Sequence, residues 1–168
     1  MLVRYVFSKN QRYGSKLISW AGSLLIKDLE KVPSHGCIQI EFDNTSEGII
    51  FESTMDGGVR LAPLSSWLKH NEICYVIVPK VQPNKEEVLS IISNMWGKKY
   101  DYPGILYFAL CFVGFILFKR PFPKSNKWAS RSRFFCLEAM FDITSYERSG
   151  MATPAKMCSD LLKREANG

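Results

Sequence analysis

The sequence predicts an α+β fold in which an antiparallel sheet packs on helices. Short apolar or alternating segments typical of strands are concentrated in the N-terminal half, and segments with helical spacing follow in the C-terminal half. Strands grouped before helices favour this class over a parallel sheet, which requires regular strand–helix alternation. The 168 residues contain no repeat or low-complexity tract, so we expect a single domain over residues 1–168.

A strand and a helix are expected first. Residues 2–7 alternate as a short strand, and Ser15 is a suitable N-cap for the helix that follows. The apolar residues at helical spacing, expected to face inward, are Leu17, Trp20, Ala21, Leu24 and Leu25.

Three or four strands are expected next, near residues 36–42, 48–54, 58–62 and 72–79. Polar and glycine-rich turns separate the first three, at residues 43–48 and 56–58. The apolar run over 72–78 predicts a central, buried strand.

The helices of the C-terminal half have clear start and stop signals. Asn84 is a good N-cap for a helix with Val88, Ile91, Ile92 and Met95 inward, and Gly97 ends it. Residues 119–132 are basic and contain proline, which indicates a surface loop. Cys136 opens a further helix with Leu137, Met140, Phe141 and Thr144 on one face. The last helix begins at Thr153-Pro154, with Met157, Cys158, Leu161 and Leu162 inward.

Residues 105–118 form an apolar run of fourteen residues without a charge. This is shorter than the roughly 20 residues that span a bilayer. The run therefore predicts a buried helix or one that lies in a membrane interface, and burial is the favoured interpretation.

Composition narrows the function classes. The net charge of +6 and the pI near 9.1 favour anionic partners, such as an anionic membrane surface, an acidic cell-wall polymer or nucleic acid. The basic residues are scattered and no nucleic-acid-binding motif is present, so nucleic acid is not expected. Five cysteines without a CxxC pair give no support for a zinc or redox site, and a reducing compartment is expected. We expect no metal and no cofactor.

Three residues suit nucleophilic catalysis. Cys136 lies at an expected helix start, where the helix dipole stabilises a thiolate, and Arg131 and Arg133 add positive charge nearby. His35 stands at the start of a strand and would take the thiol proton, while Glu52 on the next strand would hold the other ring nitrogen. The expected hairpin brings residues near 35 opposite residues near 54, so Glu52 lies beside or diagonal to His35. Backbone N–H groups at the start of the Cys136 helix could bind an oxyanion.

Simpler interpretations remain open for the same residues. Cys136 and His35 could be ordinary core residues, and Glu52 could cap a strand end. Glu138 is explained by the helix dipole alone, and Tyr100 and Trp128 are typical packing aromatics.

Several motifs, taken in chain order, resemble the circularly permuted NlpC-type, papain-like cysteine hydrolases, with the YiiX/YebB-like branch the nearest match. They are Ser34-His35-Gly36-Cys37-Ile38, Ile50-Phe51-Glu52-Ser53, Gly58-Val59-Arg60-Leu61 with Trp67, Gly97-Lys98-Lys99-Tyr100-Asp101, and Phe135-Cys136-Leu137-Glu138. The similarity extends over about residues 2–162. Leu137 stands where the family usually has Ser, and Phe135 stands where the related lecithin:retinol acyltransferase group has Asn.

The resemblance implies a permuted papain-like fold with a late nucleophile helix. It implies Cys136 as nucleophile, His35 as base, Glu52 as orienting residue and Tyr100 near the thiol. Such proteins are common in bacteria and their phages, and the N-terminal strand is not a signal peptide, so a cytoplasmic or phage-delivered protein is expected.

The function expected first is a cysteine hydrolase of the amidase or peptidase type that forms an acyl-enzyme on a peptide, amide or acyl substrate. The alternatives are a lipid-directed acyltransferase or thioesterase of the same fold and an inactive binding protein. The sequence leaves the oligomeric state open.

Overall fold

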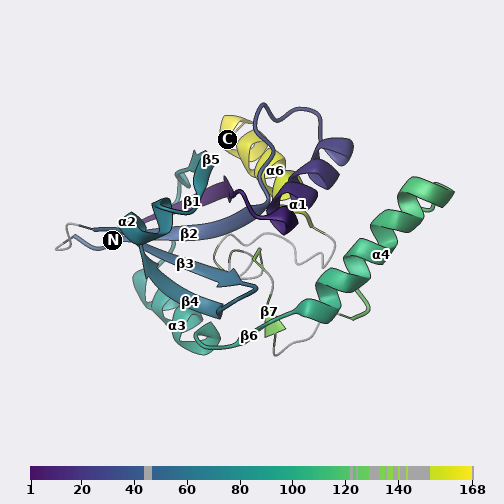
Figure 1. Cartoon of the computed structure of the whole chain (residues 1–168). Helices are drawn as coiled ribbons and strands as arrows, with labels where there is room; N and C mark the ends of the chain where they lie inside the picture. Colours follow the sequence, from purple (N-terminus) through teal and green to yellow (C-terminus); the bar gives the residue numbers. More distant parts are fainter. Residues whose placement is uncertain are drawn as a thin grey trace.

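In the computed structural model the chain forms a five-stranded antiparallel sheet with helices packed on it (Figure 1). The structure describes residues 1–43, 47–121, 123, 125–128, 133–134, 136–137, 140, 143 and 152–167. The strand order is β4-β3-β2-β1-β5. The strands are β1 (Leu2–Lys9), β2 (His35–Glu41), β3 (Ile49–Thr54), β4 (Gly58–Pro63) and β5 (Glu72–Ile77). The predicted α+β class is confirmed.

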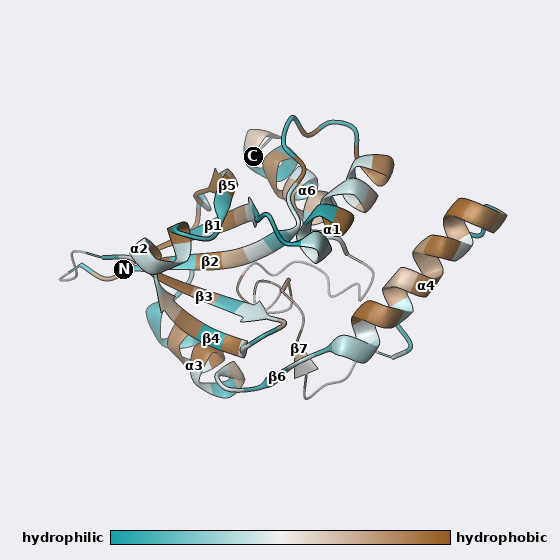
Figure 2. Ribbon diagram, viewed as in Figure 1, coloured by the Kyte–Doolittle hydropathy of each residue, from teal (hydrophilic) through white to brown (hydrophobic). Residues whose placement is uncertain are grey.

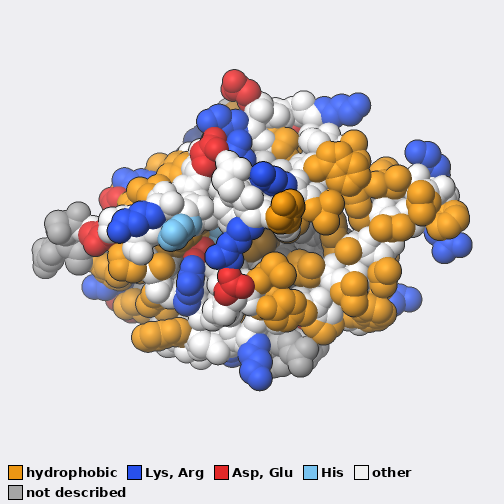
Figure 3. All heavy atoms as spheres, in the orientation of Figure 1, with side chains coloured by type: hydrophobic (Ala, Val, Ile, Leu, Met, Phe, Trp, Pro, Cys, Tyr) orange, Lys and Arg blue, Asp and Glu red, His pale blue; other side chains and the backbone are white. Residues whose placement is uncertain are grey.

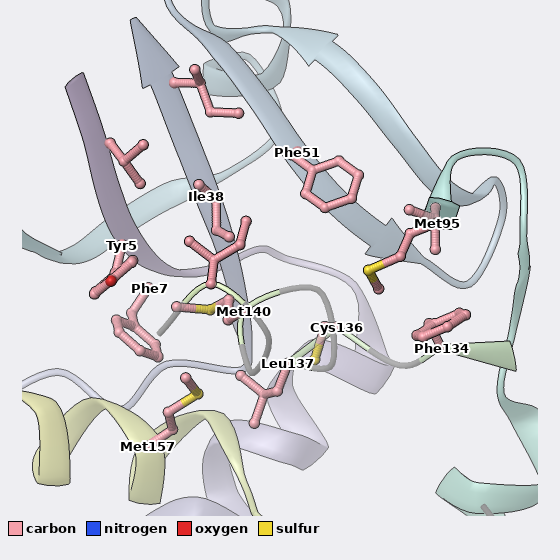
Figure 4. Packing of buried hydrophobic residues seen from close by; sticks show 14 of the residues in the cluster. Tyr5, Phe7, Ile38, Phe51, Met95, Phe134, Cys136, Leu137, Met140 and Met157 are labelled. Carbon is pink, nitrogen blue, oxygen red and sulfur yellow. The ribbon is translucent and has the colours of Figure 1, made fainter. Parts of the chain in front are cut away.

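Both faces of the sheet are covered, because consecutive residues of the central strands β1 and β2 are buried and successive side chains point to opposite faces. On one face, Phe7 and Ile38 pack with α3 (Lys85–Met95), α6 (Pro154–Asn167) and the segment around Leu137 (Figure 4). On the other face, Cys37 and Ile50 pack with Trp67 of α2 (Leu64–Leu68). The sheet is thus the central layer of the domain.

Two predicted helices are confirmed with their end signals. The Asn84 side chain caps α3 by accepting a hydrogen bond from the Glu86 N–H at 2.8 Å. Gly97 follows α3 with a φ of 75°, a conformation that favours glycine. In α6, which begins at Pro154, the predicted inward residues Met157, Cys158 and Leu161 are buried and Leu162 is partly buried.

A second, two-stranded sheet brings distant segments together. β6 (Lys99–Tyr100) and β7 (Arg133–Phe134) pair in parallel. The β6 end is attached to the main sheet, because the Val59 N–H donates to the Lys98 carbonyl at 2.9 Å. Gly58 permits this contact: its φ is 63°, and a Cβ there would lie 2.3 Å from the same carbonyl oxygen.

Two predictions about burial are wrong. β5 is an edge strand rather than a central one, and Val76 is 45% exposed, because an apolar run does not show how many neighbours a strand has. In α1 (Tyr13–Leu25) most of the expected inward face is exposed, including Leu17, Trp20 and Leu24, while Ala21 is buried. Ser15 is not the N-cap of α1, which is Arg12; its hydroxyl instead accepts from the Asn10 N–H.

The favoured burial of residues 105–118 is also wrong. They form α4 (Tyr102–Phe118), which extends away from the rest of the domain and is hydrophobic along most of its length (Figures 1 and 2). Gly104 and Phe112 are its buried residues. Within the described part of the chain, no helix is both long enough and apolar enough to cross a membrane.

Candidate functional site

His35 occupies the first position of β2, opposite Ser8 of β1. Its side chain is 14% exposed, so the ring is mostly enclosed. The next residue, Gly36, has no side chain, and a Cβ there would lie 2.7 Å from both Leu137 Cδ2 and Met140 Sδ. The segment that follows Cys136 therefore packs against β2 beside His35, at a position where a larger residue would displace it.

Glu52 lies diagonal to His35 across the β2–β3 pair. The observed register pairs Ile38 with Phe51 and Ile40 with Ile49, which extends to place His35 and Glu52 on the same face. His35 Nε2 and Glu52 Oε2 are 2.8 Å apart. The structure thus brings together these two predicted residues, and the strand register explains why.

The Glu52 carboxylate is held by two further side chains. Arg60 donates to Oε1 from Nε at 3.0 Å and from Nη2 at 2.7 Å, and Trp67 donates from Nε1 to Oε2 at 2.9 Å. Glu52 is only 2% exposed, so both oxygens are enclosed by these donors. Burial by itself raises the pKa of Glu52, but the bonds from His35, Arg60 and Trp67 outweigh it and lower the pKa from 4.5 to about 2.

The sequence did not assign the roles of Arg60 and Trp67. Arg60 is directly opposite Glu52 in the β3–β4 pair, and the turn at residues 56–58 could have indicated this pairing. Trp67 comes from α2, a helix of five residues that is too short to show a helical period. Its contribution follows only from the tertiary fold.

Cys136 follows β7 and is 6% exposed (Figure 4). Two donors fix the Phe134 carbonyl two residues before it: Ser53 Oγ at 2.7 Å and the Asp101 N–H at 3.2 Å. Ser53 is the neighbour of Glu52 on β3. One hydrogen bond therefore links the strand that carries the carboxylate to the segment that carries the thiol.

Cys136 and Leu137 form a turn, and Met140 and Ile143 are helical. The predicted residues Phe141, Thr144, Phe135, Arg131 and Glu138 lie outside the described residues, as does the side chain of Arg133.

The pKa of His35 depends on both Glu52 and Cys136. Burial lowers the pKa of His35, but the side-chain hydrogen bonds with Cys136 and Glu52, together with their negative charges, outweigh burial and raise the pKa from 6.5 to about 10. Because Nε2 is bound to Glu52, Nδ1 is the nitrogen left for the thiol. The site therefore favours a protonated His35 imidazole beside an ionised Glu52 carboxylate at neutral pH.

Tyr100 is buried one strand away from the thiol segment. It pairs with Phe134 in the β6–β7 sheet, belongs to the same buried cluster as Cys136, and makes an edge-on contact with Tyr102 at 5.3 Å between ring centroids. This location agrees with packing near the site, and any contact with a substrate stays a prediction.

No cluster of three or more His, Cys, Asp or Glu side chains that could hold a metal ion occurs among the residues that the structure describes. A cavity of about 620 Å³ lies between α1, α4 and α6, and none of His35, Glu52 or Cys136 lines it. Its carboxylates pair with lysines, Asp28 with Lys163 and Asp160 with Lys156. It is therefore separate from the candidate site.

The site thus consists of a thiol, an imidazole and a clamped carboxylate. Comparisons of the chain with protein-family models, with curated proteins and with solved structures found no match. The arrangement of side chains is consequently the basis for any functional assignment.

Proposed function

We propose that this protein is a cysteine hydrolase of the amidase or peptidase type that cleaves an amide or ester through an acyl-enzyme on Cys136. One observation carries the proposal: His35 Nε2 lies 2.8 Å from the buried Glu52 carboxylate, and the neighbouring Cys136 side chain is among the groups that raise the pKa of His35. A nucleophile, its base and a group that orients the base are the parts that this chemistry requires.

In the first step, the Cys136 thiolate attacks the substrate carbonyl carbon and forms a carbon–sulfur bond. Protonated His35 gives its proton to the leaving nitrogen or oxygen, and the bond from that atom to the carbonyl carbon breaks. In the second step, His35 takes a proton from water, and the resulting hydroxide attacks the thioester. The carbon–sulfur bond breaks, the carboxylic acid leaves, and the Cys136 thiolate is restored beside the protonated His35.

Glu52 acts in this proposal as a positioning residue. Arg60 and Trp67 restrict its carboxylate from two directions, so Oε2 stays directed at His35 Nε2. A fixed carboxylate selects the ring orientation that turns Nδ1 towards the thiol and stabilises the imidazolium. The buried Trp67 N–H strengthens this restriction because it has few alternative acceptors.

The chain order also supports the permuted papain-like assignment. The base and the carboxylate come from consecutive strands of the sheet, and the thiol comes from a later segment that packs against it. This is the order His, Glu, Cys that the sequence resemblance implies. The YiiX/YebB-like assignment rests on that resemblance.

Alkylation by iodoacetamide tests the activated thiol. Cys136 should react faster than a free thiol near neutral pH, and His35→Ala should slow it by about a hundredfold, within the range for lost acid–base assistance. His70→Ala is the matched control, since His70 is exposed and is the other histidine of the chain. Equal alkylation rates in His35→Ala and the wild type would contradict the proposal.

Acyl trapping tests turnover. The protein is incubated with a panel of aryl esters and acyl amides, and its intact mass is measured. A mass increase of one acyl group, absent in Cys136→Ala, is the expected result. A reactive thiol that never acquires an acyl group would favour the inactive binding protein instead.

The exposed apolar helix α4 favours a second candidate, a lipid-directed acyltransferase or thioesterase using the same residues. Product analysis separates the two. A trapped acyl group that is released to water identifies a hydrolase or thioesterase, and one that moves to an added amine or alcohol identifies an acyltransferase.

A further inference from the structure

An apolar surface extends over α4 and α1, and we call it the α4–α1 surface. Its members are large hydrophobic side chains that are 44% to 67% exposed. They are Leu106, Leu110, Val113, Leu117 and Phe118 of α4 and Leu17, Trp20 and Leu24 of α1. Figure 3 shows hydrophobic side chains gathered over the two helices on one side of the molecule. Contiguous apolar surface of this kind indicates a binding site.

Four of the exposed residues of α4 lie on one face of the helix. Leu106, Leu110, Val113 and Leu117 follow one another at intervals of four, three and four residues, which aligns them along the axis. A few residues beside this face contact the rest of the protein. Ile105 packs against the core, and Phe112 makes an edge-on contact with Trp20 at 5.9 Å between centroids. The helix therefore has few contacts with the domain and leaves this face uncovered.

Charge indicates what this surface meets. No charged residue occurs from Tyr102 to Phe118, and two exposed basic residues, Lys119 and Arg120, follow directly. The Arg120 guanidinium lies over the Phe118 ring at 5.6 Å, so positive charge is placed at the edge of the apolar surface. Basic residues beside an apolar helix face are the pattern that anionic lipid surfaces attract.

Two aromatic residues add to this pattern. Tyr107 of α4 and Trp128 of the following loop pack together at 5.4 Å between ring centroids, and Trp128 is 47% exposed. Tyrosine and tryptophan are enriched where a membrane core meets water, because each combines an apolar ring with a polar group. A second copy of this chain is a poorer occupant, since two copies with a net charge of +6 repel each other.

We propose that the α4–α1 surface docks the protein on an anionic membrane surface, with α4 lying in the interface plane. At 17 residues α4 is about 25 Å long, which is less than the roughly 30 Å of a bilayer core. Its exposed stripe enters the lipid, and Lys119 and Arg120 meet the anionic headgroups. Asp101 caps α4 and its N–H binds the Phe134 carbonyl, so α4 begins close to the thiol segment.

Vesicle flotation of the full chain tests docking. The protein should float with vesicles of equal parts phosphatidylcholine and phosphatidylglycerol, and about tenfold or more weakly with phosphatidylcholine alone. High salt should also weaken binding to the mixed vesicles. Equal binding to both compositions, or no binding to either, would overturn the proposal.

Variants locate the contact. Leu110→Glu combined with Leu117→Glu should weaken flotation at least about tenfold, because two side chains that enter the lipid become charged. Leu89→Glu is the matched control, since Leu89 is an exposed leucine on α3. Lys119→Gln and Arg120→Gln should each weaken binding about fivefold. If Leu89→Glu weakens flotation as much as the double variant, the proposed surface is wrong.

Sedimentation tests the alternative that a second copy of the chain covers the α4–α1 surface. A concentration-dependent dimer that the double variant abolishes, in a protein that does not float, would overturn the proposal. Cys136→Ala should float as the wild type does, because docking does not depend on the thiol. Loss of catalysis and loss of docking are thus separate results.

Discussion

The strand pair β2–β3 and the helix α4 invert the usual relation between polarity and burial. In β2–β3, a charged residue, Glu52, is 2% exposed inside an otherwise apolar sheet. In α4, Leu117 and Phe118 are 66% and 67% exposed although no charged residue interrupts the helix. The most hydrophobic segment of the chain therefore lies largely outside the core, whereas the Glu52 carboxylate lies inside it.

Each exception costs folding free energy unless something compensates for it. For Glu52 the compensation is internal: His35, Arg60 and Trp67 supply hydrogen bonds and positive charge. For α4 the described residues supply only partial cover, on the Phe112 side. The comparison teaches that a buried polar group is stabilised by partners within the chain, whereas an exposed apolar face indicates a partner outside the chain.

The largest expected effect comes from removing the buried carboxylate. Glu52→Ala should lower the free energy of unfolding by about 3–5 kcal/mol, because the Trp67 N–H and the His35 ring lose their acceptor in a buried position. Chemical denaturation measures this. Glu72→Ala is the control, since its ion pairs with Lys9 and Lys31 are exposed, and it should change stability by less than about 1 kcal/mol. Equal losses of unfolding free energy in the two variants would mean that the buried Glu52 network stabilises the protein no more than an exposed ion pair does.

The next prediction compares two leucines directly. Leu137→Ala should cost about 2–5 kcal/mol, because Leu137 is completely buried next to Cys136 and the change leaves a cavity. Leu110→Ala on α4 should change stability by less than about 0.5 kcal/mol, because Leu110 is 54% exposed. Thermal unfolding of both variants checks the difference. A large loss in Leu110→Ala would show that α4 is covered in solution by another part of the protein or by another copy.

A smaller effect is expected at the glycine that follows His35. Gly36→Ala should destabilise the protein by about 1–3 kcal/mol, because the new Cβ meets Leu137 and Met140. It should also slow alkylation of Cys136, because the thiol segment is displaced from His35. Gly14→Ala is the control: no atom lies within 4 Å of its added Cβ, and a helical alanine should stabilise α1 by up to about 1 kcal/mol. Normal alkylation in a destabilised Gly36→Ala protein would show that the space at Gly36 matters for packing and does not position Cys136 relative to His35.

The pH dependence gives a more gradual effect. The pKa of His35 is raised from 6.5 to about 10 in the folded protein, so its contribution to stability is complete below pH 6.5 and is lost as the pH rises towards 10. The pKa of Glu52 is lowered from 4.5 to about 2, so its contribution is complete above pH 4.5 and is lost as the pH falls towards 2. Between pH 4.5 and 6.5 both contributions are complete.

Above pH 6.5 the wild type should lose about 1 kcal/mol of stability per pH unit relative to His35→Gln. Denaturation of both proteins across this range measures the loss. The comparison is made below pH 9. Burial raises the pKa of the Cys37 and Cys158 thiols above their ordinary value of 9.0, so both thiols stay protonated in this range and do not change the stability with pH. Parallel profiles for the two proteins would mean that His35 carries no charge in this site.

Much of the fold could be predicted because local patterns determine it. The strand period gave β1 to β4 within about two residues, and Asn84 and Gly97 marked the ends of α3. The proximity of His35 and Glu52 followed from hairpin geometry, since a short turn restricts which residues face each other. The catalytic role of these residues stays a prediction.

Other features could not be predicted because they depend on what packs against a segment. The sequences of β5 and α4 are apolar enough for positions in the core. An apolar sequence pattern does not show how many other elements pack against the segment. Trp67 reaches Glu52 from a short helix beyond the next strand, a contact with no local signal.

By itself, the sequence determined the elements, the fold class and the candidate residues His35, Glu52 and Cys136, because periodicity, turn residues and side-chain chemistry are local properties. Only the tertiary structure decided that Arg60 and Trp67 clamp the carboxylate, that Gly36 leaves room for the thiol segment, and that α4 lies outside the core. These outcomes depend on distances between residues far apart in the chain, and the packing of the whole domain sets those distances.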